Sequence, residues 1–310
     1  MKKKKEPDIT AEECVVPNDL GEDYTSTLVK NTDPAGMSQR LLIGTPTRGS
    51  VRMEWVLARY GQIIPPNWST GQWLHFMQSY APMGFMVADA QNVIVKHAIE
   101  YNYEWVLLVE DDTMPPPDAF LQLNRYIKDA DIPVVSGLYY QKADPPEPLV
   151  YRGAGNSSYD DFVIGDKVWC DGIPTGFFLC SMKILKLMWD ESPEYRVGSV
   201  VTRRVFDQPA YVWYDPQTGI ASAHTGTSDL AWCKRVIEGN YIGRAGWPEI
   251  AKKKYPFLVD TNIFCRHITP DGVIYPPENV MPNMRKIEKP KDPKKKKKTP
   301  LPSESTSKTE

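Results

Sequence analysis

Residues 105–117 read WVLLVEDDTMPPP, an apolar run that ends in a cluster of acids. The first five residues are apolar without alternation, which is typical of a strand buried on both faces of a parallel sheet. Glu110, Asp111 and Asp112 follow, and three prolines then turn the chain out of the sheet. Open α/β sheets bind ligands at the carboxyl ends of their strands. The acids are therefore candidate ligand-binding residues.

Three neighbouring carboxylates repel one another unless a cation lies between them. Hard divalent cations prefer oxygen ligands, so a cation site is one interpretation of this turn. A solvated acidic turn without any ligand is the other interpretation.

Strands and helices are predicted to alternate around this stretch. Besides 105–109, apolar runs predict strands at 40–46, 71–80 and 133–139. Helical spacing predicts helices at 51–60, 87–101 and 118–128. This alternation is typical of an α/β fold with a mainly parallel sheet flanked by helices on both faces.

The pattern changes after residue 140. Proline-rich turns and short β-like segments at 149–152, 162–164 and 168–170 predict a smaller mixed β region in the C-terminal half. Residues 190–227 are expected to be irregular, as in a lid or a binding segment. The remaining predicted elements are helices at 181–189 and 229–238 and two short strands, 257–260 and 263–267.

The two ends of the 310-residue chain differ from its middle. Residues 1–37 and 286–310 are polar and contain lysine runs, and both segments are predicted to be disordered. Residues 38–285 are predicted to form one domain, which contains 23 lysines and arginines and 27 aspartates and glutamates. The lysine tails are expected to aid solubility or to make weak contacts with nucleic acid.

The five cysteines are scattered, and no pair has the spacing of a metal finger. No apolar run approaches the ~20 residues that span a membrane, and no signal peptide is apparent. These observations predict a cytoplasmic protein without a transmembrane segment.

Four features follow one another in a fixed order. They are the strand that ends in Glu110-Asp111-Asp112, the small-residue segment at 172–179, an aspartate that opens a helix (Asp229), and a lone histidine on a late strand (His267). With this order, residues 40–275 resemble the GT-A fold glycosyltransferases, most of all the inverting family 2 enzymes of the Asp-x-Asp type.

The resemblance implies a nucleoside-diphosphate sugar as donor and Mn²⁺ or Mg²⁺ as cofactor. It implies Asp112 and His267 as metal ligands and Asp229 as the catalytic base. It also implies contacts with the donor from Thr45, Pro46, Arg48, Asp89, Asn92, Glu110, Asp111, Thr175 and Gly176. The chain departs from the family pattern at Glu110, where the family has aspartate, and at Ser228, where it has glutamate.

The chemistry of glycosyl transfer suits these residue types. The departing diphosphate gathers negative charge, which a divalent cation neutralises. The acceptor hydroxyl loses a proton, which a nearby carboxylate takes. Asp229 is expected to stay ionised at a helix N-terminus, which suits a base. The alternative is that Asp229 only caps the helix and has no catalytic role. His267 and His97 each have two interpretations, as a ligand-binding residue or as a residue that only packs in the protein interior.

Other functions remain open at this stage. The acceptor is a glycan, a protein, a lipid or a modified nucleic-acid base. A non-catalytic module that binds nucleic acid through the lysine tails is an alternative. A metal-dependent phosphoesterase is another, but such sites need more histidine and aspartate ligands than a chain with four histidines readily supplies.

Overall fold

The apolar run 105–109 forms the strand β3 (Trp105–Val109) in the computed structural model, which describes residues 41–65, 68, 77–153 and 158–277. All five residues of β3 are buried. Trp105, Leu107 and Val109 belong to one hydrophobic core, whereas Val106 and Leu108 belong to another. Successive strand residues point to opposite faces, so a strand with a core on each face needs an unbroken apolar run. The prediction of a doubly buried strand is confirmed.

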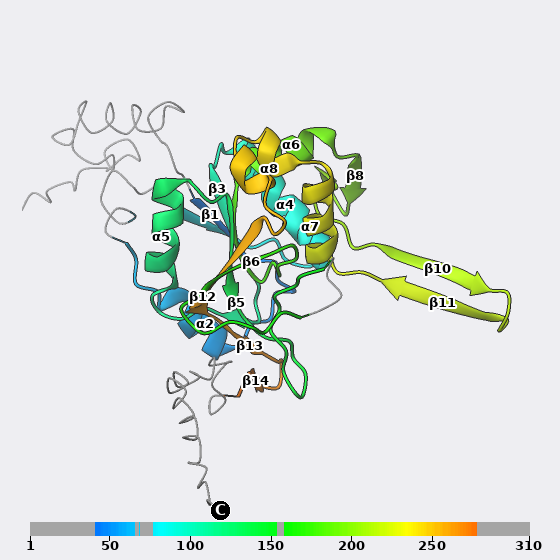
Figure 1. The fold of residues 1–310 in the computed structure, drawn as a ribbon, viewed down its shortest axis with the longest axis horizontal. Coiled ribbons are helices and arrows are strands. Elements are labelled where there is room, and N and C mark those ends of the chain that lie inside the picture. The colour runs from blue at the N-terminus through cyan, green and yellow to red at the C-terminus, as the bar shows by residue number, and fades with distance from the viewer. Residues whose placement is uncertain (1–40, 66–67, 69–76, 154–157, 278–310) are drawn as a thin grey trace, which may run out of the picture.

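The main sheet of the described residues has seven strands in the order β2-β1-β3-β7-β5-β12-β6 (Figure 1). Five of them run in one direction: β2 (Met77–Tyr80), β1 (Leu41–Gly44), β3, β5 (Val134–Leu138) and β12 (Phe257–Phe264). The other two are antiparallel to their neighbours: β7 (Phe177–Ser181) and β6 (Lys167–Cys170). The predicted mainly parallel sheet is confirmed.

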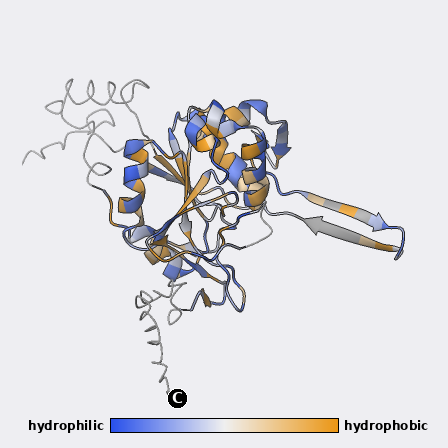
Figure 2. Cartoon of the chain, viewed as in Figure 1, coloured by the Kyte–Doolittle hydropathy of each residue, from blue (hydrophilic) through white to orange (hydrophobic). Residues whose placement is uncertain are grey.

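Helices cover both faces of this sheet, as predicted (Figure 1). The helices α2 (Met53–Tyr60) and α5 (Ala119–Asp129) pack on one face through Trp55, Phe120 and Leu123. The opposite face carries α4 (Val87–Glu100), α6 (Met182–Glu191) and α7 (Ser228–Glu238). Two short helices follow, α8 (Tyr241–Arg244) and α9 (Pro248–Ala251). Hydrophobic residues concentrate on the strands and on the inner sides of the helices (Figure 2).

Smaller antiparallel sheets complete the fold and match the predicted mixed β region. One sheet joins β4 (Thr113–Met114), β13 (Arg266–Ile268) and β14 (Ile274–Tyr275). The other two are hairpins, β8 (Glu194–Val197) with β9 (Val200–Arg203), and β10 (Ala210–Asp215) with β11 (Ile220–Thr225).

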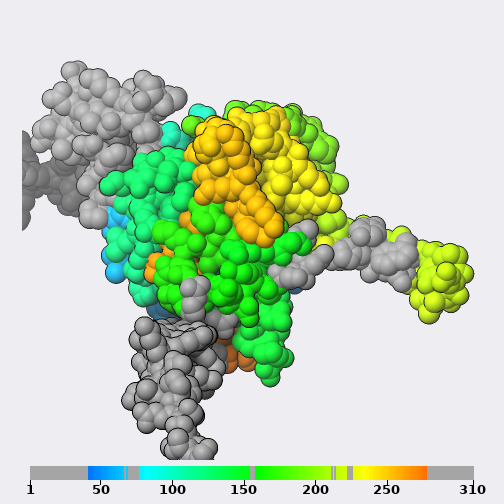
Figure 3. All heavy atoms as spheres, in the orientation of Figure 1, coloured from blue at the N-terminus to red at the C-terminus, as the bar shows by residue number. Residues whose placement is uncertain are grey.

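The prediction that residues 190–227 are irregular is wrong, because the two hairpins occupy most of this segment. The β10–β11 hairpin stands clear of the body (Figures 1 and 3), and Val212, Tyr214 and Ile220 are exposed on it. A strand outside the core shows no alternation of buried and exposed residues, so hydrophobic periodicity does not reveal it. The signal is the turn before β11, where Gly219 has a φ of +70°.

Two further predictions need adjustment, and others lie outside the residues that the structure describes. The sequence predicts two late strands at 257–260 and 263–267; the structure has β12, whose register shifts between Asp260 and Phe264, and then β13, so the boundary between the two strands lies at Cys265. The segments at 149–152 and 162–164 form no strands; Tyr151 makes isolated bridges instead. Residues 1–37, 286–310 and most of the predicted strand at 71–80 lie outside the described residues.

His97 is a packing residue, as one of its two interpretations predicts. Its ring stacks on Tyr80 with 4.1 Å between the ring centroids. Burial lowers the pKa of His97. Within the described ranges, the helices are too short or too polar for any of them to cross a lipid bilayer.

One buried charge lies in the sheet away from the acidic turn. The Asp260 side chain is fully buried on β12, accepts a hydrogen bond of 2.6 Å from the Tyr126 hydroxyl, and forms ion pairs with Arg125 and Lys167. Burial by itself would raise the pKa of Asp260. The Tyr126 hydroxyl and the charges of Lys167 and Arg125 outweigh burial and hold this pKa below its usual value.

Candidate functional site

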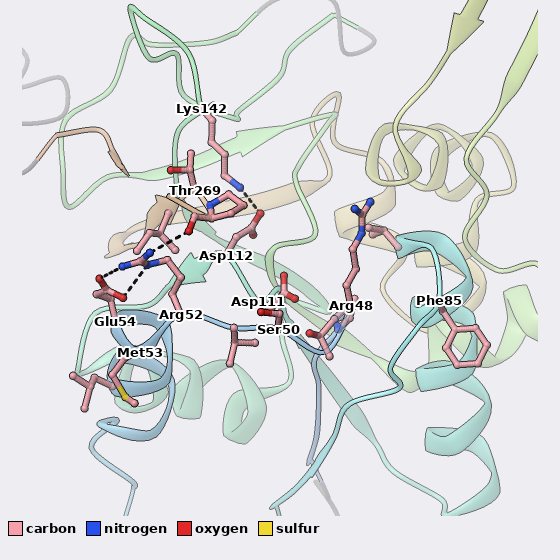
Figure 4. Close-up of a pocket in the computed structure, with 17 residues that line it drawn as sticks. Arg48, Ser50, Arg52, Met53, Glu54, Phe85, Asp111, Asp112, Lys142 and Thr269 are labelled. Carbon is pink, nitrogen blue, oxygen red and sulfur yellow. Dashed lines mark hydrogen bonds and ion pairs between the residues drawn. The ribbon is translucent and has the colours of Figure 1, made fainter. Parts of the chain in front are cut away.

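A pocket of about 970 Å³ lies at the carboxyl ends of β1, β3 and β5 (Figure 4). Its walls come from the loop after β1, the start of α2, the acidic turn after β3, the loop after β5 and the residues after β13. β1, β3 and β5 run in the same direction, so the loops that follow them meet at one edge of the sheet. We call this cavity the carboxyl-end pocket.

Backbone hydrogen bonds fix the acidic turn at the edge of this pocket. The Glu110 amide donates to the Gly176 carbonyl at 2.9 Å, and the Thr113 amide donates to the Glu110 carbonyl at 3.1 Å. The indole of Trp55 donates to the same Glu110 carbonyl at 2.7 Å. The Ile268 amide donates to the Asp112 carbonyl at 2.8 Å, where β13 pairs with β4. The turn is therefore held by its main chain, and its carboxylates are left to other partners.

The pocket lining contains three cationic and three anionic side chains. Arg52 forms an ion pair with Glu54 at 2.6 Å and donates to the Pro270 carbonyl at 3.1 Å. Lys142 points at Asp112 and forms an ion pair with it (Figure 4). The other two charges in the lining are Arg48 and Asp111. The pocket thus carries both the positive groups that attract an anion and the acids predicted from the sequence.

A fourth acid, Asp229, lies beside the turn. The negative charges of Asp112, Asp229 and Asp111 all act on Glu110. Burial, followed by these neighbouring negative charges, raises the pKa of Glu110 to about 8. Glu110 is therefore mostly protonated at neutral pH and can donate a hydrogen bond.

Asp229 lies in the first turn of α7, which begins one residue earlier than predicted. Its own carboxylate accepts the Leu230 amide at 2.8 Å. Burial raises the pKa of Asp229, while hydrogen bonds from Thr227 and Leu230 act in the opposite direction. A helix N-terminus alone predicts an ionised carboxylate; burial makes this carboxylate a stronger base than a solvated aspartate.

The residues expected to bind a metal are neighbours, but they do not form a metal site as arranged here. His267 lies opposite Thr113 in the β13–β4 pair, and its Nδ1 lies 2.6 Å from the Tyr140 carbonyl. Burial lowers the pKa of His267 to about 4, although the charge of Asp112 opposes this. Asp112 is paired with Lys142, and in the described part of the chain no three His, Cys, Asp or Glu side chains converge on one point. In this arrangement the Asp112 carboxylate is occupied by Lys142, so it is not available to a divalent cation.

The structure brings together some of the predicted site residues and separates others. Those in the pocket lining are Pro46, Arg48, Asp111 and Asp112. Those beside the acidic turn are Glu110, Gly176, Asp229 and His267. Thr45 and Thr175 are buried, and Thr175 accepts a hydrogen bond from Gln91 at 2.9 Å.

Asp89 and Asn92 hold the β8–β9 hairpin, and neither lines the carboxyl-end pocket. The Tyr195 hydroxyl donates to Asp89 at 2.7 Å. The Asn92 amide donates to the Phe206 carbonyl and accepts from the Val205 and Phe206 amides. We infer a structural role for both residues in place of the expected contact with a donor.

Sequence reasoning missed Lys142, Arg52 and Tyr139. Lys142 lies on the loop that leaves β5 and Arg52 on the loop that leaves β1, so the rule that ligands bind at carboxyl ends would have found both. Tyr139 gives no local signal. Its hydroxyl accepts from the Gly176 amide at 2.5 Å, and this contact depends on how β5 and β7 pair.

Replacing Gly176 with alanine is expected to destabilise the protein by about 1–3 kcal/mol, because the new methyl group overpacks the site. A Cβ atom at this position would lie 2.5 Å from the Tyr139 hydroxyl and 2.7 Å from Thr113 Oγ1. Urea unfolding measures the loss. The control is a double-mutant cycle with Tyr139→Phe: because the nearest clash is then absent, Gly176→Ala should cost less in the Tyr139→Phe background than in wild type. A Gly176→Ala variant as stable as wild type would contradict this packing.

No family model matches the chain, and no curated protein matches it in sequence. Among solved structures, it is similar to A197 from STIV, with a TM-score of 0.43 and 14% identity over 79% of this chain and 98% of A197. It is also similar to S. aureus TarS 1-349 in complex with UDP, with a TM-score of 0.31 and 16% identity over 47% of this chain and 48% of that one. Another S. aureus TarS structure has a TM-score of 0.31 and 13% identity over 50% of this chain and 30% of that one. Function is therefore inferred from the residues of this chain.

Proposed function

We propose that this protein is a glycosyltransferase that moves a sugar from a nucleoside-diphosphate sugar to an acceptor hydroxyl, with inversion. The observation that carries the proposal is the carboxyl-end pocket at the acidic turn, together with the half-buried carboxylates of Glu110 and Asp229, which lie close enough to interact. Such a site combines a cavity for a donor with a base for an acceptor.

The donor half of the proposal rests on the lining of the pocket. Arg48, Arg52 and Lys142 contribute positive charge at the ends of parallel strands. Cationic side chains stabilise a diphosphate, on which negative charge accumulates as the sugar departs. The volume of about 970 Å³ is within the range of small-molecule sites, and it is large enough for a nucleotide with a sugar.

The acceptor half of the proposal assigns Asp229 as the general base. The acceptor oxygen forms a bond to the anomeric carbon while the bond to the diphosphate breaks, and the electron pair of that bond leaves with the diphosphate. Asp229 takes the acceptor proton. The raised pKa of Asp229 favours this transfer.

The requirement for Mn²⁺ or Mg²⁺ stays a prediction from the resemblance. Because Asp112 already pairs with an ammonium group, no step of the proposed reaction is assigned to a metal. The nature of the acceptor also stays open among a glycan, a protein, a lipid and a modified nucleic-acid base. The lysine tails that suggested contact with nucleic acid lie outside the described residues.

A thermal-shift panel of UDP-, GDP-, CDP- and dTDP-sugars, each with EDTA or with Mn²⁺, tests the proposal. One sugar nucleotide at a hundred times its dissociation constant is expected to stabilise the protein by ~2.7 kcal/mol. The variant Arg48→Gln, in the pocket lining, should weaken the shift. Arg204→Gln, which is half exposed beside Asp207, is the matched control and should not. If every donor leaves the melting temperature unchanged under both conditions, the protein is not a nucleotide-sugar transferase.

A further inference from the structure

Lys142 holds the position in which a divalent cation was expected. Its ammonium group pairs with Oδ2 of Asp112, the predicted metal ligand, and both residues line the carboxyl-end pocket (Figure 4). The Lys142 side chain is 29% exposed and that of Asp112 is 33% exposed, so each retains a surface toward the cavity. An anion in the pocket therefore has direct access to the ammonium group.

The loop that carries Lys142 is braced at its base. The Gln141 amide donates to the Glu147 carbonyl at 2.8 Å, and the Leu149 amide donates to the Tyr139 carbonyl at 2.9 Å. His267 makes a contact of 2.6 Å with the Tyr140 carbonyl from the opposite side. These contacts fix the backbone on both sides of Lys142. The lysine is thus presented to the pocket by a shaped loop, which distinguishes it from a solvated surface lysine.

The charges near Asp112 favour a resident cation in this position. Four carboxylates lie in or beside the acidic turn, because Asp111, Asp112 and Asp229 all act on Glu110. A diphosphate that enters the pocket meets this negative field unless a positive group lies between them. Lys142 is the cation in contact with Asp112, and a lysine ammonium binds phosphate oxygens as a point charge.

We propose that Lys142 supplies the counter-charge for the departing diphosphate in place of a divalent metal, and that it pairs with Asp112 until the diphosphate enters the pocket; this inference rests on the proposed function. When the bond between the anomeric carbon and the diphosphate breaks, the electron pair goes to the diphosphate oxygen. Lys142 stays protonated and donates a hydrogen bond to that oxygen. The acceptor proton goes to Asp229, so Lys142 carries no proton through the reaction.

Binding of nucleoside diphosphates to the full chain tests this inference by titration calorimetry. The probes are UDP, GDP, CDP and dTDP, each with EDTA or with Mn²⁺. Wild type is expected to bind one of them in EDTA with an affinity that Mn²⁺ leaves unchanged. Lys142→Met should weaken this binding about tenfold to a hundredfold, as for loss of a charge-assisted hydrogen bond. Lys142→Arg should retain most of it, and the exposed control Lys252→Met should be unchanged.

The variant Asp112→Asn distinguishes a lysine site from a metal site, because the two hypotheses predict opposite effects on nucleoside-diphosphate binding. If Lys142 is the cation, removing the carboxylate frees the ammonium group, and binding in EDTA persists or strengthens. If a metal is the cation, Asp112→Asn abolishes binding that depends on Mn²⁺. Binding by wild type only with Mn²⁺, insensitive to Lys142→Met, overturns this inference and leaves the proposed function standing. No binding under either condition overturns both.

Discussion

Asp229→Asn is expected to lower the turnover number about 10²–10⁴-fold, the usual contribution of a general base. The amide is nearly isosteric with the carboxylate and can still accept from the Leu230 amide through its oxygen. Helix α7 should therefore keep its position, and donor binding should stay near the wild-type value. Release of the nucleoside diphosphate with water as the acceptor measures the loss, so the natural acceptor is not needed for the assay.

The matched control for this prediction is Glu238→Gln on the same helix. Glu238 is exposed and lies four residues after Lys234, far along α7 from its first turn. Glu238→Gln should keep the wild-type turnover. Asp229→Asn with wild-type turnover and an unchanged melting temperature would show that Asp229 is a structural residue of α7.

The double variant Arg125→Met/Lys167→Met is expected to lose about 3–5 kcal/mol of stability, the largest stability effect expected for this protein. The reason is that the anion of this ion-pair cluster is buried whereas its two cations are partly exposed. The Asp260 side chain is fully buried, whereas those of Arg125 and Lys167 are both 41% exposed. Removing the cations leaves a buried carboxylate without a charged partner, although the Tyr126 hydroxyl and the Asn262 amides still donate to it. Asp260→Asn should cost less, because the released cations can turn toward water.

The pH dependence of the same variant gives an independent check. In wild type the pKa of Asp260 is below its usual value, so its ionised form adds stability above the unfolded-state pKa, and this is lost as the pH falls through the folded-state pKa. Without the two cations, burial raises the pKa of Asp260, and the penalty is greatest where the unfolded carboxyl is ionised. The difference in unfolding free energy between wild type and variant should therefore shrink from about pH 7 to about pH 4.

The control for the charge change is Lys234→Met/Lys252→Met, which removes two lysines whose side chains are 74% and 70% exposed. This control should lose little stability, because exposed ion pairs contribute at most ~1 kcal/mol. Equal losses in the two double variants, or a difference that grows in acid, would contradict a buried carboxylate held by its partners.

Elements with a strong hydrophobic pattern were predictable from the sequence. β3 has an unbroken apolar run because it has a core on both faces, and β5 is buried throughout and apolar except at Ser136. The helices α2, α4 and α5 show helical spacing because each buries one side. Pattern reasoning missed β7, which lies between β3 and β5 and is antiparallel to both. Its residues follow a segment of glycine, proline and threonine, and nothing local indicates that a later segment inserts between two earlier strands.

The candidate site was predictable only to the level of the acidic turn. Strand ends indicate an edge of the sheet, and Asp111, Asp112 and Arg48 do line one pocket there. Whether a carboxylate faces a metal or an ammonium depends on the path of the loop after β5, which carries Lys142. The pKa of Glu110 depends on burial and on distant acids, neither of which a single sequence reveals.

Four hydrogen bonds hold the acidic turn through the main-chain groups of Glu110, Asp112 and Thr113. These four bonds do not depend on which side chains stand at Asp111 and Asp112. Under the proposed lysine site, point substitutions at Asp112 or Lys142 would change the cation without breaking these bonds. The cation at this site could then change in evolution while the fold stays the same.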